Sequence, residues 1–170
     1  AFKKAIDYYE RRTLTPDTII KQKTVKNEQK PAKNYEKAYK YWQNALKDNF
    51  EAQEYLLSRG IDLATANRFG LGFNSFYFEK TNTRLNAITI PLSKNCFSAR
   101  NINPNEEMRY YKTKDSDVDI FNKQAMTNKQ PICAITEGEF DCLSFETLNV
   151  NCVGLGSANN VNLFIESEKD

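Results

Sequence analysis

The chain has 170 residues, a length that can hold one domain of ordinary size, or one small domain and part of a second. Hydrophobic residues make up 40% and charged residues 27% of it, which indicates a globular protein and excludes a disordered or membrane-spanning chain. The net charge of +2 is too small to indicate nucleic-acid binding by itself, although lysine and arginine are concentrated in the first half.

The cysteine and histidine content indicates which metal sites and disulfides the chain can form. The cysteines stand singly, with no Cys-x-x-Cys pair, and the sequence contains no histidine. A structural zinc site within these residues is therefore not expected, and the pattern favours reduced, buried thiols in a cytoplasmic protein over disulfides. The cysteines are Cys96, Cys133, Cys142 and Cys152.

The first stretch of the chain predicts little packed structure. Residues 2–12 predict a short helix, and the polar residues 13–33 predict a linker, because they can bury little apolar surface. No apolar signal segment follows Ala1, so we expect the chain to begin inside a longer protein.

Three helices are predicted next. Aromatic residues recur at helical spacing over 35–46, and we expect this stripe in the core rather than as a platform for stacked bases. A second helix is predicted over about 51–58. Asp62 is the expected N-cap of a third helix, over about 63–69, and a glycine follows each of these two helices.

After the helices, apolar and polar residues alternate. This pattern predicts a small antiparallel meander with strands at 88–92, 97–102 and about 108–112. Pro91 places the first strand at a sheet edge or marks its end. The polar face interleaves cations with aromatic rings, which suits single-stranded nucleic acid because phosphates need cations and unstacked bases need flat apolar surfaces. An ordinary solvated sheet face is the equally favoured alternative. The set is Arg100, Arg109, Tyr110, Tyr111, Lys112, Lys114, Phe121 and Lys123.

The last part of the sequence predicts a parallel strand–helix–strand unit. Residues 132–136 and 150–153 are expected as buried strands, with a helix over 139–148 between them. Ligands of open α/β sheets gather at the carboxyl ends of the strands. We therefore expect Glu137 and the glycine turn at 154–157 to lie on one rim.

This rim carries three carboxylates within five residues, Glu137, Glu139 and Asp141. Such oxygen-rich clusters suit Mg²⁺ or Mn²⁺, ions that neutralise charge and align the reacting oxygens in phosphoryl transfer. A second role that fits Glu137 is general base for a 3′-hydroxyl. The alternative is a plain turn followed by acidic residues that favour the positive N-terminus of a helix.

These residues together resemble one enzyme family. Residues 134–141, with Leu155-Gly156-Ser157, resemble the opening of a TOPRIM domain, the metal-binding fold shared by bacterial primases and certain topoisomerases. Residues 55–61 and 69–73 resemble the helical start of the bacterial-type primase polymerase core. Four short motifs match the basic subdomain of that core in type and order, and the resemblance covers about residues 35–168. The motifs are Ile90-Pro91-Leu92, Ala99-Arg100, Arg109-Tyr110 and Phe121-Asn122-Lys123.

The resemblance implies an α+β fold in three parts. Residues 1–34 would be a linker and helix after a zinc-binding module that is missing here. Residues 35–130 would form a basic subdomain of helices and antiparallel strands, and residues 131–170 the first half of a parallel α/β TOPRIM sheet. Zinc is expected only in the module outside these residues, and an Asp-x-Asp motif with further metal ligands is expected beyond Asp170.

The resemblance also implies roles for single residues. Glu137 corresponds to the catalytic glutamate and Asp141 to a second acidic site residue, and both would bind Mg²⁺ or Mn²⁺. The residues expected to contact template or nucleotide are Arg100, Arg109, Tyr110, Lys112 and Lys123.

The implied function is that of a DNA primase. The full protein would synthesise RNA primers from ribonucleoside triphosphates on single-stranded DNA in the cytoplasm, with a replicative helicase as partner. The 170-residue fragment is expected to make no primer alone. Ser98-Ala99 stand where the family has glycines, and Lys112 stands where it has asparagine, departures that favour a phage or mobile-element branch. The alternatives are another TOPRIM enzyme, a nuclease or topoisomerase, and a non-catalytic nucleic-acid-binding or helicase-docking module.

Overall fold

The computed structural model describes residues 33–79, 82–103, 107–113, 120–128, 130–157, 160, 161 and 165. The helix expected over 2–12, nearly all of the expected linker, and Lys114 lie outside these residues. Within them the fold is α+β, as predicted, with an antiparallel sheet followed by a small parallel one. Residues 32–170 form one compact unit, and the domain boundary expected near residue 130 stays a prediction.

The three predicted helices are confirmed as α2 (Glu36–Lys47), α3 (Phe50–Ser58) and α4 (Leu63–Arg68). Asp62 caps α4 as expected: its carboxylate accepts a hydrogen bond of 2.6 Å from the backbone N–H of Thr65. This bond lowers the pKa of the Asp62 carboxyl, because it favours the charged form. No helix in the described part of the chain is long and apolar enough to cross a membrane.

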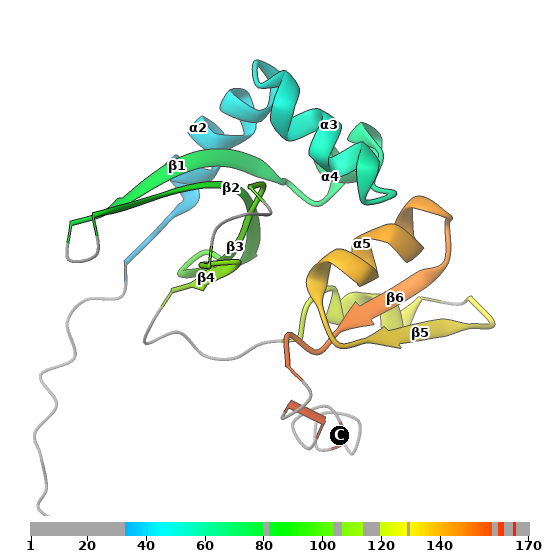
Figure 1. Cartoon of the computed structure of the whole chain (residues 1–170). Coiled ribbons are helices and arrows are strands. Elements are labelled where there is room, and N and C mark those ends of the chain that lie inside the picture. The colour runs from blue at the N-terminus through cyan, green and yellow to red at the C-terminus, as the bar shows by residue number, and fades with distance from the viewer. Residues whose placement is uncertain are drawn as a thin grey trace, which may run out of the picture. The chain divides into compact units, whose positions relative to one another are not determined.

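The antiparallel sheet has the order β1-β2-β3-β4, so the predicted meander is confirmed (Figure 1). Its strands are β1 (Gly72–Phe78), β2 (Thr83–Ser93), β3 (Cys96–Asn101) and β4 (Tyr110–Lys112). Strand β1 was not predicted. Its aromatic residues lie on both faces of the strand, Phe73 in one hydrophobic cluster and Phe76 and Phe78 in another, so the sequence shows no alternation of apolar and polar residues.

Pro91 lies inside β2, a strand that is longer than predicted and has a neighbour on each side. The pairing of β1 with β2 ends where Gly72 lies opposite Thr89, so Pro91 pairs only with Phe97 of β3. The β2–β3 register also shifts between Pro91 and Ser93. At Pro91 itself β2 has a partner on one side only, as the prediction of an edge position requires. The position where proline lacks an N–H faces no partner strand.

Helix α2 covers one face of this sheet. Its buried aromatic residues, Tyr39 and Trp42, pack with Leu85, Ala87, Phe97 and Ala99 of the strands, which confirms the aromatic stripe as core. The approach is close at Gly72, where a Cβ atom would lie 2.6 Å from the Cβ of Trp42. Glycine at this position therefore lets α2 lie directly on β1.

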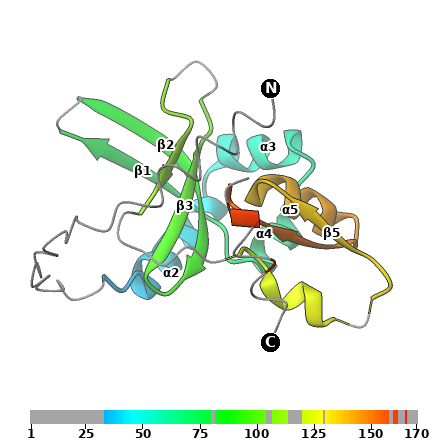
Figure 2. The ribbon, with the colours of Figure 1, turned by 90° about the horizontal axis from the view of Figure 1, so that it is seen from below.

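The parallel unit consists of β5 (Cys133–Thr136), α5 (Glu139–Thr147) and β6 (Asn151–Gly154), with β5 and β6 paired in parallel as predicted. It shares a hydrophobic core with the helices: α5 packs against α4 (Figure 2), and one cluster contains residues of α2, α3, α4, β2, α5 and β6. This core includes Leu46, Leu56, Ala66, Ile88, Ile90, Phe140, Leu143 and Cys152.

The two strands of the parallel unit differ in burial. Strand β6 is buried along its whole length, as predicted. The prediction that β5 is buried was wrong, because Ile135 is 54% exposed and Ile132 just before the strand is 68% exposed. In the described residues β5 pairs only with β6. A run of apolar residues indicates the strand but not whether both of its faces are covered.

Candidate functional site

The acidic rim lies where β5 ends and α5 begins. Glu137 is exposed in the bend after Thr136, and Thr136 pairs with Gly154 at the carboxyl end of β6. Asp141 is exposed in the first turn of α5, and its Oδ2 atom lies 3.7 Å from where a Cβ of Gly138 would be. Both predicted acidic residues are therefore accessible at the positive end of the same helix.

The carboxyl end of β6 approaches this helix start closely. A Cβ atom on Gly154 would lie 3.2 Å from the backbone oxygen of Gly138 and 3.4 Å from the Cα of Glu139. A side chain at position 154 would push the two segments apart. Glycine there keeps the end of β6 beside the acidic rim, as the glycine turn in the sequence predicted.

The predicted basic set is partly gathered on one face of the antiparallel sheet. Arg100 pairs across the strands with Tyr110, and Ser98 pairs with Lys112. Because side chains alternate along a strand, Arg100, Tyr110 and Lys112 lie on one face, opposite the residues that pack under α2. The guanidinium of Arg100 stacks on the ring of Tyr110, with Cζ 4.2 Å from the ring centroid.

Lys112 also reaches toward the parallel unit. A Cβ atom on Gly156 would lie 3.5 Å from Lys112 Nζ and 3.5 Å from Glu139 Oε1. Lys112 is half-buried and the Glu139 residue is only 7% exposed, and both the ammonium and the carboxylate lie close to the glycine. Glu139, counted with the accessible carboxylates in the sequence, instead points toward Gly156 and away from solvent.

Lys123 follows a segment that is attached to the end of β6. Phe121 forms an antiparallel bridge with Gly154, through backbone hydrogen bonds of 2.8 and 3.0 Å. Asn122 has a left-handed backbone, and its side-chain amide donates to Glu146 Oε1 at 2.9 Å and to the Cys152 oxygen at 2.8 Å. Lys123 then begins the short 3₁₀ helix η1 (Lys123–Thr127) with an exposed side chain.

Arg109 lies outside the group formed by Arg100, Tyr110 and Lys112. It lies immediately before β4 and is exposed, and its backbone oxygen accepts from the N–H of Asn101 at 3.0 Å. Among the described residues its side chain has no hydrogen bond or ion pair. The structure thus brings Arg100, Tyr110 and Lys112 together, and places Lys123 beside β6, on a segment that is attached to Gly154 and Cys152.

Two residues that hold these groups were not expected from the sequence. Tyr55 of α3 accepts a hydrogen bond of 3.0 Å from Arg100 Nε. Glu146, buried in α5, accepts from the Cys152 N–H at 2.9 Å as well as from Asn122, and forms an ion pair of 3.2 Å with Arg68. The one sequence signal for Glu146 is a polar residue on the apolar face of a predicted helix. Nothing in the sequence indicates that it pairs with Arg68, Asn122 and Cys152.

The site offers oxygen ligands rather than sulfur or nitrogen ligands. All four cysteines are free, and burial raises the pKa of the Cys142 thiol, which therefore stays protonated at neutral pH. Among the described residues, no group of three or more His, Cys, Asp or Glu side chains converges to hold a metal ion. Glu137 and Asp141 still suit Mg²⁺, which is commonly bound by one or two carboxylates together with waters and substrate phosphates.

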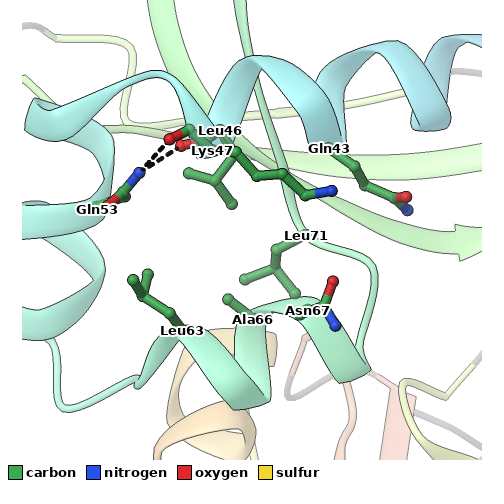
Figure 3. A pocket seen from close by; sticks show the side chains of 8 residues that line it. All are labelled: Gln43, Leu46, Lys47, Gln53, Leu63, Ala66, Asn67 and Leu71. Atoms are coloured by element: carbon green, nitrogen blue, oxygen red, sulfur yellow. Dashed lines mark hydrogen bonds between the residues drawn. The ribbon is translucent and has the colours of Figure 1, made fainter.

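A pocket of the described residues lies elsewhere. A pocket of about 330 Å³ is lined by residues of α2, α3 and α4, among them Leu46, Leu63 and Ala66 (Figure 3). At its edge Gln53 donates hydrogen bonds to the backbone oxygens of Leu46 and Lys47, at 3.0 and 2.7 Å. None of the predicted site residues lines it, so it is separate from the acidic rim and the basic face.

The fold is similar to that of the catalytic, RNA polymerase domains of bacterial DNA primases. The structure matches the zinc-binding and RNA polymerase domains of Aquifex aeolicus primase with a TM-score of 0.63 and 22% identity, over 97% of this chain and 51% of that one. At these identities the likeness is one of fold.

Two nucleic-acid complexes are also similar. A DnaG primase catalytic domain bound to single-stranded DNA gives a TM-score of 0.55 at 15% identity, over 69% of this chain and 52% of that one. The RNA polymerase domain of Mycobacterium tuberculosis DnaG, in complex with double-stranded DNA, gives 0.52 at 17% identity over the same shares, 69% and 52%. This chain thus spans about half the length of each of these structures. No protein-family model and no curated protein matches the sequence.

Proposed function

We propose that this chain forms the basic face and the first acidic strand–helix–strand unit of a DNA primase. The whole protein would synthesise RNA primers from ribonucleoside triphosphates on single-stranded DNA, with Mg²⁺ or Mn²⁺ at the acidic rim. The similarity in fold to primase catalytic domains, one of them bound to single-stranded DNA, supports this proposal. The TOPRIM assignment, the cytoplasmic setting, the helicase partner and the phage or mobile-element branch remain predictions from the sequence.

The observation that carries the proposal is the approach of the basic face to the acidic rim. Lys112 of β4 reaches the turn after β6, and Glu139, two residues beyond Glu137, reaches the same turn from α5. Phosphoryl transfer needs cations that hold phosphates next to carboxylates that hold a metal ion. The two predicted sets of side chains would meet this need together because the sheet and the parallel unit share one core.

In this proposal each predicted site residue has a separate role. Arg100, Arg109, Lys112 and Lys123 would bind phosphates of the template or nucleotide, and Tyr110 would add an aromatic surface beside Arg100. Glu137 and Asp141 would hold the metal ion. When bound, that ion supplies charge neutralisation on the transferring phosphoryl group.

The first experiment tests the basic face. A labelled oligothymidylate is titrated with the chain at several salt concentrations, and the affinity is expected to fall as salt rises, because cations on the protein release counterions from the DNA. Arg100→Ala with Arg109→Ala should weaken binding and make the slope of log K against log salt shallower by about 0.7 for each phosphate that the variant no longer neutralises. Lys37→Ala with Lys40→Ala, which removes the same charge from exposed positions of α2, is the matched control.

Equal losses in the two double variants would mean that net charge alone attracts the DNA and would contradict a binding face at Arg100. Binding that does not change with salt would contradict the proposal altogether.

A non-catalytic nucleic-acid-binding module is the second candidate. Its support is that the described residues present only two exposed carboxylates at the rim, Glu137 and Asp141. The two candidates differ in metal binding. Titration with Mn²⁺, followed by water proton relaxation, should show a site that Glu137→Gln with Asp141→Asn abolishes if the rim is catalytic, and no such site if the module only binds DNA.

A further inference from the structure

Arg100 is held on two sides by aromatic side chains. Its Nε donates a hydrogen bond of 3.0 Å to the Tyr55 hydroxyl, and its guanidinium carbon lies 4.2 Å from the centroid of the Tyr110 ring. Within the described residues, its Nη1 and Nη2 groups form no hydrogen bond or ion pair. A guanidinium fixed at Nε presents these two amino groups as a planar fork, which matches two oxygens of a phosphate.

Tyr55 also touches the helix that starts at the acidic rim. Its ring meets the ring of Phe140 edge to face, with centroids 6.1 Å apart and an interplanar angle of 69°. Phe140 is only 4% exposed and lies between Glu139 and Asp141 in the first turn of α5. One side chain of α3 therefore contacts both the basic face, through its hydroxyl, and the acidic helix, through its ring.

We propose that Tyr55 is a positioning residue for phosphate recognition: its hydroxyl fixes the Arg100 guanidinium, and its ring sets the place of that guanidinium relative to the first turn of α5. This inference rests on the proposed function, because it takes Arg100 as a phosphate ligand. The phosphate belongs either to the nucleic-acid backbone or to a nucleoside triphosphate, and both present the oxygens that the Arg100 fork would bind.

Preorganisation is the physical reason for an effect on binding. An arginine side chain loses much rotamer freedom when it binds a phosphate, and a side chain that the protein already holds in place loses less. The Tyr55 hydroxyl would therefore strengthen phosphate binding without touching the phosphate. We expect an effect of about fivefold on affinity, within the range for immobilising one long side chain.

The test is a double-mutant cycle on the chain with Tyr55→Phe and Arg100→Ala. Phenylalanine keeps the ring contact with Phe140 and removes only the acceptor of Arg100 Nε. Affinities are measured for oligothymidylate and, in a separate arm, for ATP. Tyr55→Phe should weaken binding of at least one of these ligands about fivefold in the wild-type background and should have no effect in the Arg100→Ala background. The arm that responds identifies the source of the phosphate.

The matched control is Tyr77→Phe. Tyr77 of β1 also uses its hydroxyl in a side-chain hydrogen bond, of 2.9 Å to Asn82 at the end of the β1–β2 hairpin. Its replacement should leave both affinities unchanged. The thermal midpoint of each variant is recorded, since a purely structural role of Tyr55 would lower the midpoint and weaken binding equally in both Arg100 backgrounds.

The outcomes separate the two proposals. If Arg100→Ala weakens binding but Tyr55→Phe does not, or if Tyr55→Phe acts equally with and without Arg100, the positioning role is overturned while the proposed binding face stands. If Arg100→Ala changes neither affinity, the assignment of Arg100 as a phosphate ligand fails, and the role of Tyr55 fails with it.

Discussion

At the scale of single residues, the Glu146 carboxylate is one of the groups that hold the segment before Lys123. It is buried in α5 and accepts hydrogen bonds from the Asn122 amide and the Cys152 N–H, both at 2.9 Å. Its other oxygen pairs with Arg68 of α4 at 3.2 Å. The Arg68 side chain is 51% exposed, so solvent screens the ion pair, and the hydrogen bonds from the buried Cys152 N–H and the half-buried Asn122 amide matter more.

We therefore predict that Glu146→Ala lowers the free energy of unfolding by about 2–3 kcal/mol, because the buried Cys152 N–H and the half-buried Asn122 amide both lose an acceptor. Glu146→Gln keeps one amide oxygen as an acceptor and should cost about half as much. Urea unfolding measures both values. Glu51→Ala, at an exposed position in the first turn of α3, is the control and should change stability by less than about 0.5 kcal/mol. A Glu146→Ala variant as stable as this control would show that the network does not hold the segment.

At the scale of elements, opposite charges from the strand β4 and the helix α5 lie beside the same turn, at Gly156. Lys112 Nζ and Glu139 Oε1 each lie 3.5 Å from the Cβ position of Gly156, and the Glu139 side chain forms no hydrogen bond with another described residue. Gly156 has a φ of +71°, a left-handed conformation that favours glycine. The turn therefore leaves room for both side chains.

Reversing the charge of Glu139 should lower the stability of the fold, and reversing the charge of Lys112 as well should restore part of that stability. We predict that Glu139→Lys lowers the free energy of unfolding by about 2 kcal/mol, since it puts two cations beside one turn. Adding Lys112→Glu to it should recover about 1 kcal/mol. Glu51→Lys alone and in combination with Lys112→Glu is the control cycle and should show no coupling. Losses that simply add in the Glu139 cycle would mean that the two side chains act independently.

The elements also show how far the sequence could be used to predict the structure. Helical spacing, the Asp62 cap and the strand alternation depend on local chemistry, and they predicted α2–α4 and most of the meander. Glu137 and Asp141 were placed at a strand end because β5 and α5 are also local patterns. The exposure of β5 and the burial of Glu139 depend on which distant segments pack there, and no local pattern carries that information.

At the scale of the whole molecule, one hydrophobic core connects the antiparallel sheet, which carries the basic face, with the parallel unit, which carries the acidic rim. Ile88 and Ile90 of the antiparallel sheet share a hydrophobic cluster with Phe140 and Leu143 of α5. The resemblance to primases predicted both sets of site residues but not the contacts that join them. Tyr55, Glu146 and Gly156 lie at those contacts; the sequence motifs include Tyr55 and Gly156 but do not indicate which residues they meet.

The central claim is that a metal ion at the acidic rim and nucleic acid on the basic face occupy one site. The measurement that tests it most directly is the ³¹P relaxation of a bound oligothymidylate during titration with Mn²⁺, whose unpaired electrons broaden only nearby resonances. We predict strong broadening with the wild-type chain, beyond that of the free oligonucleotide in Mn²⁺, and its loss with Glu137→Gln and Asp141→Asn although the DNA stays bound. Equal broadening with and without these two carboxylates would contradict the account.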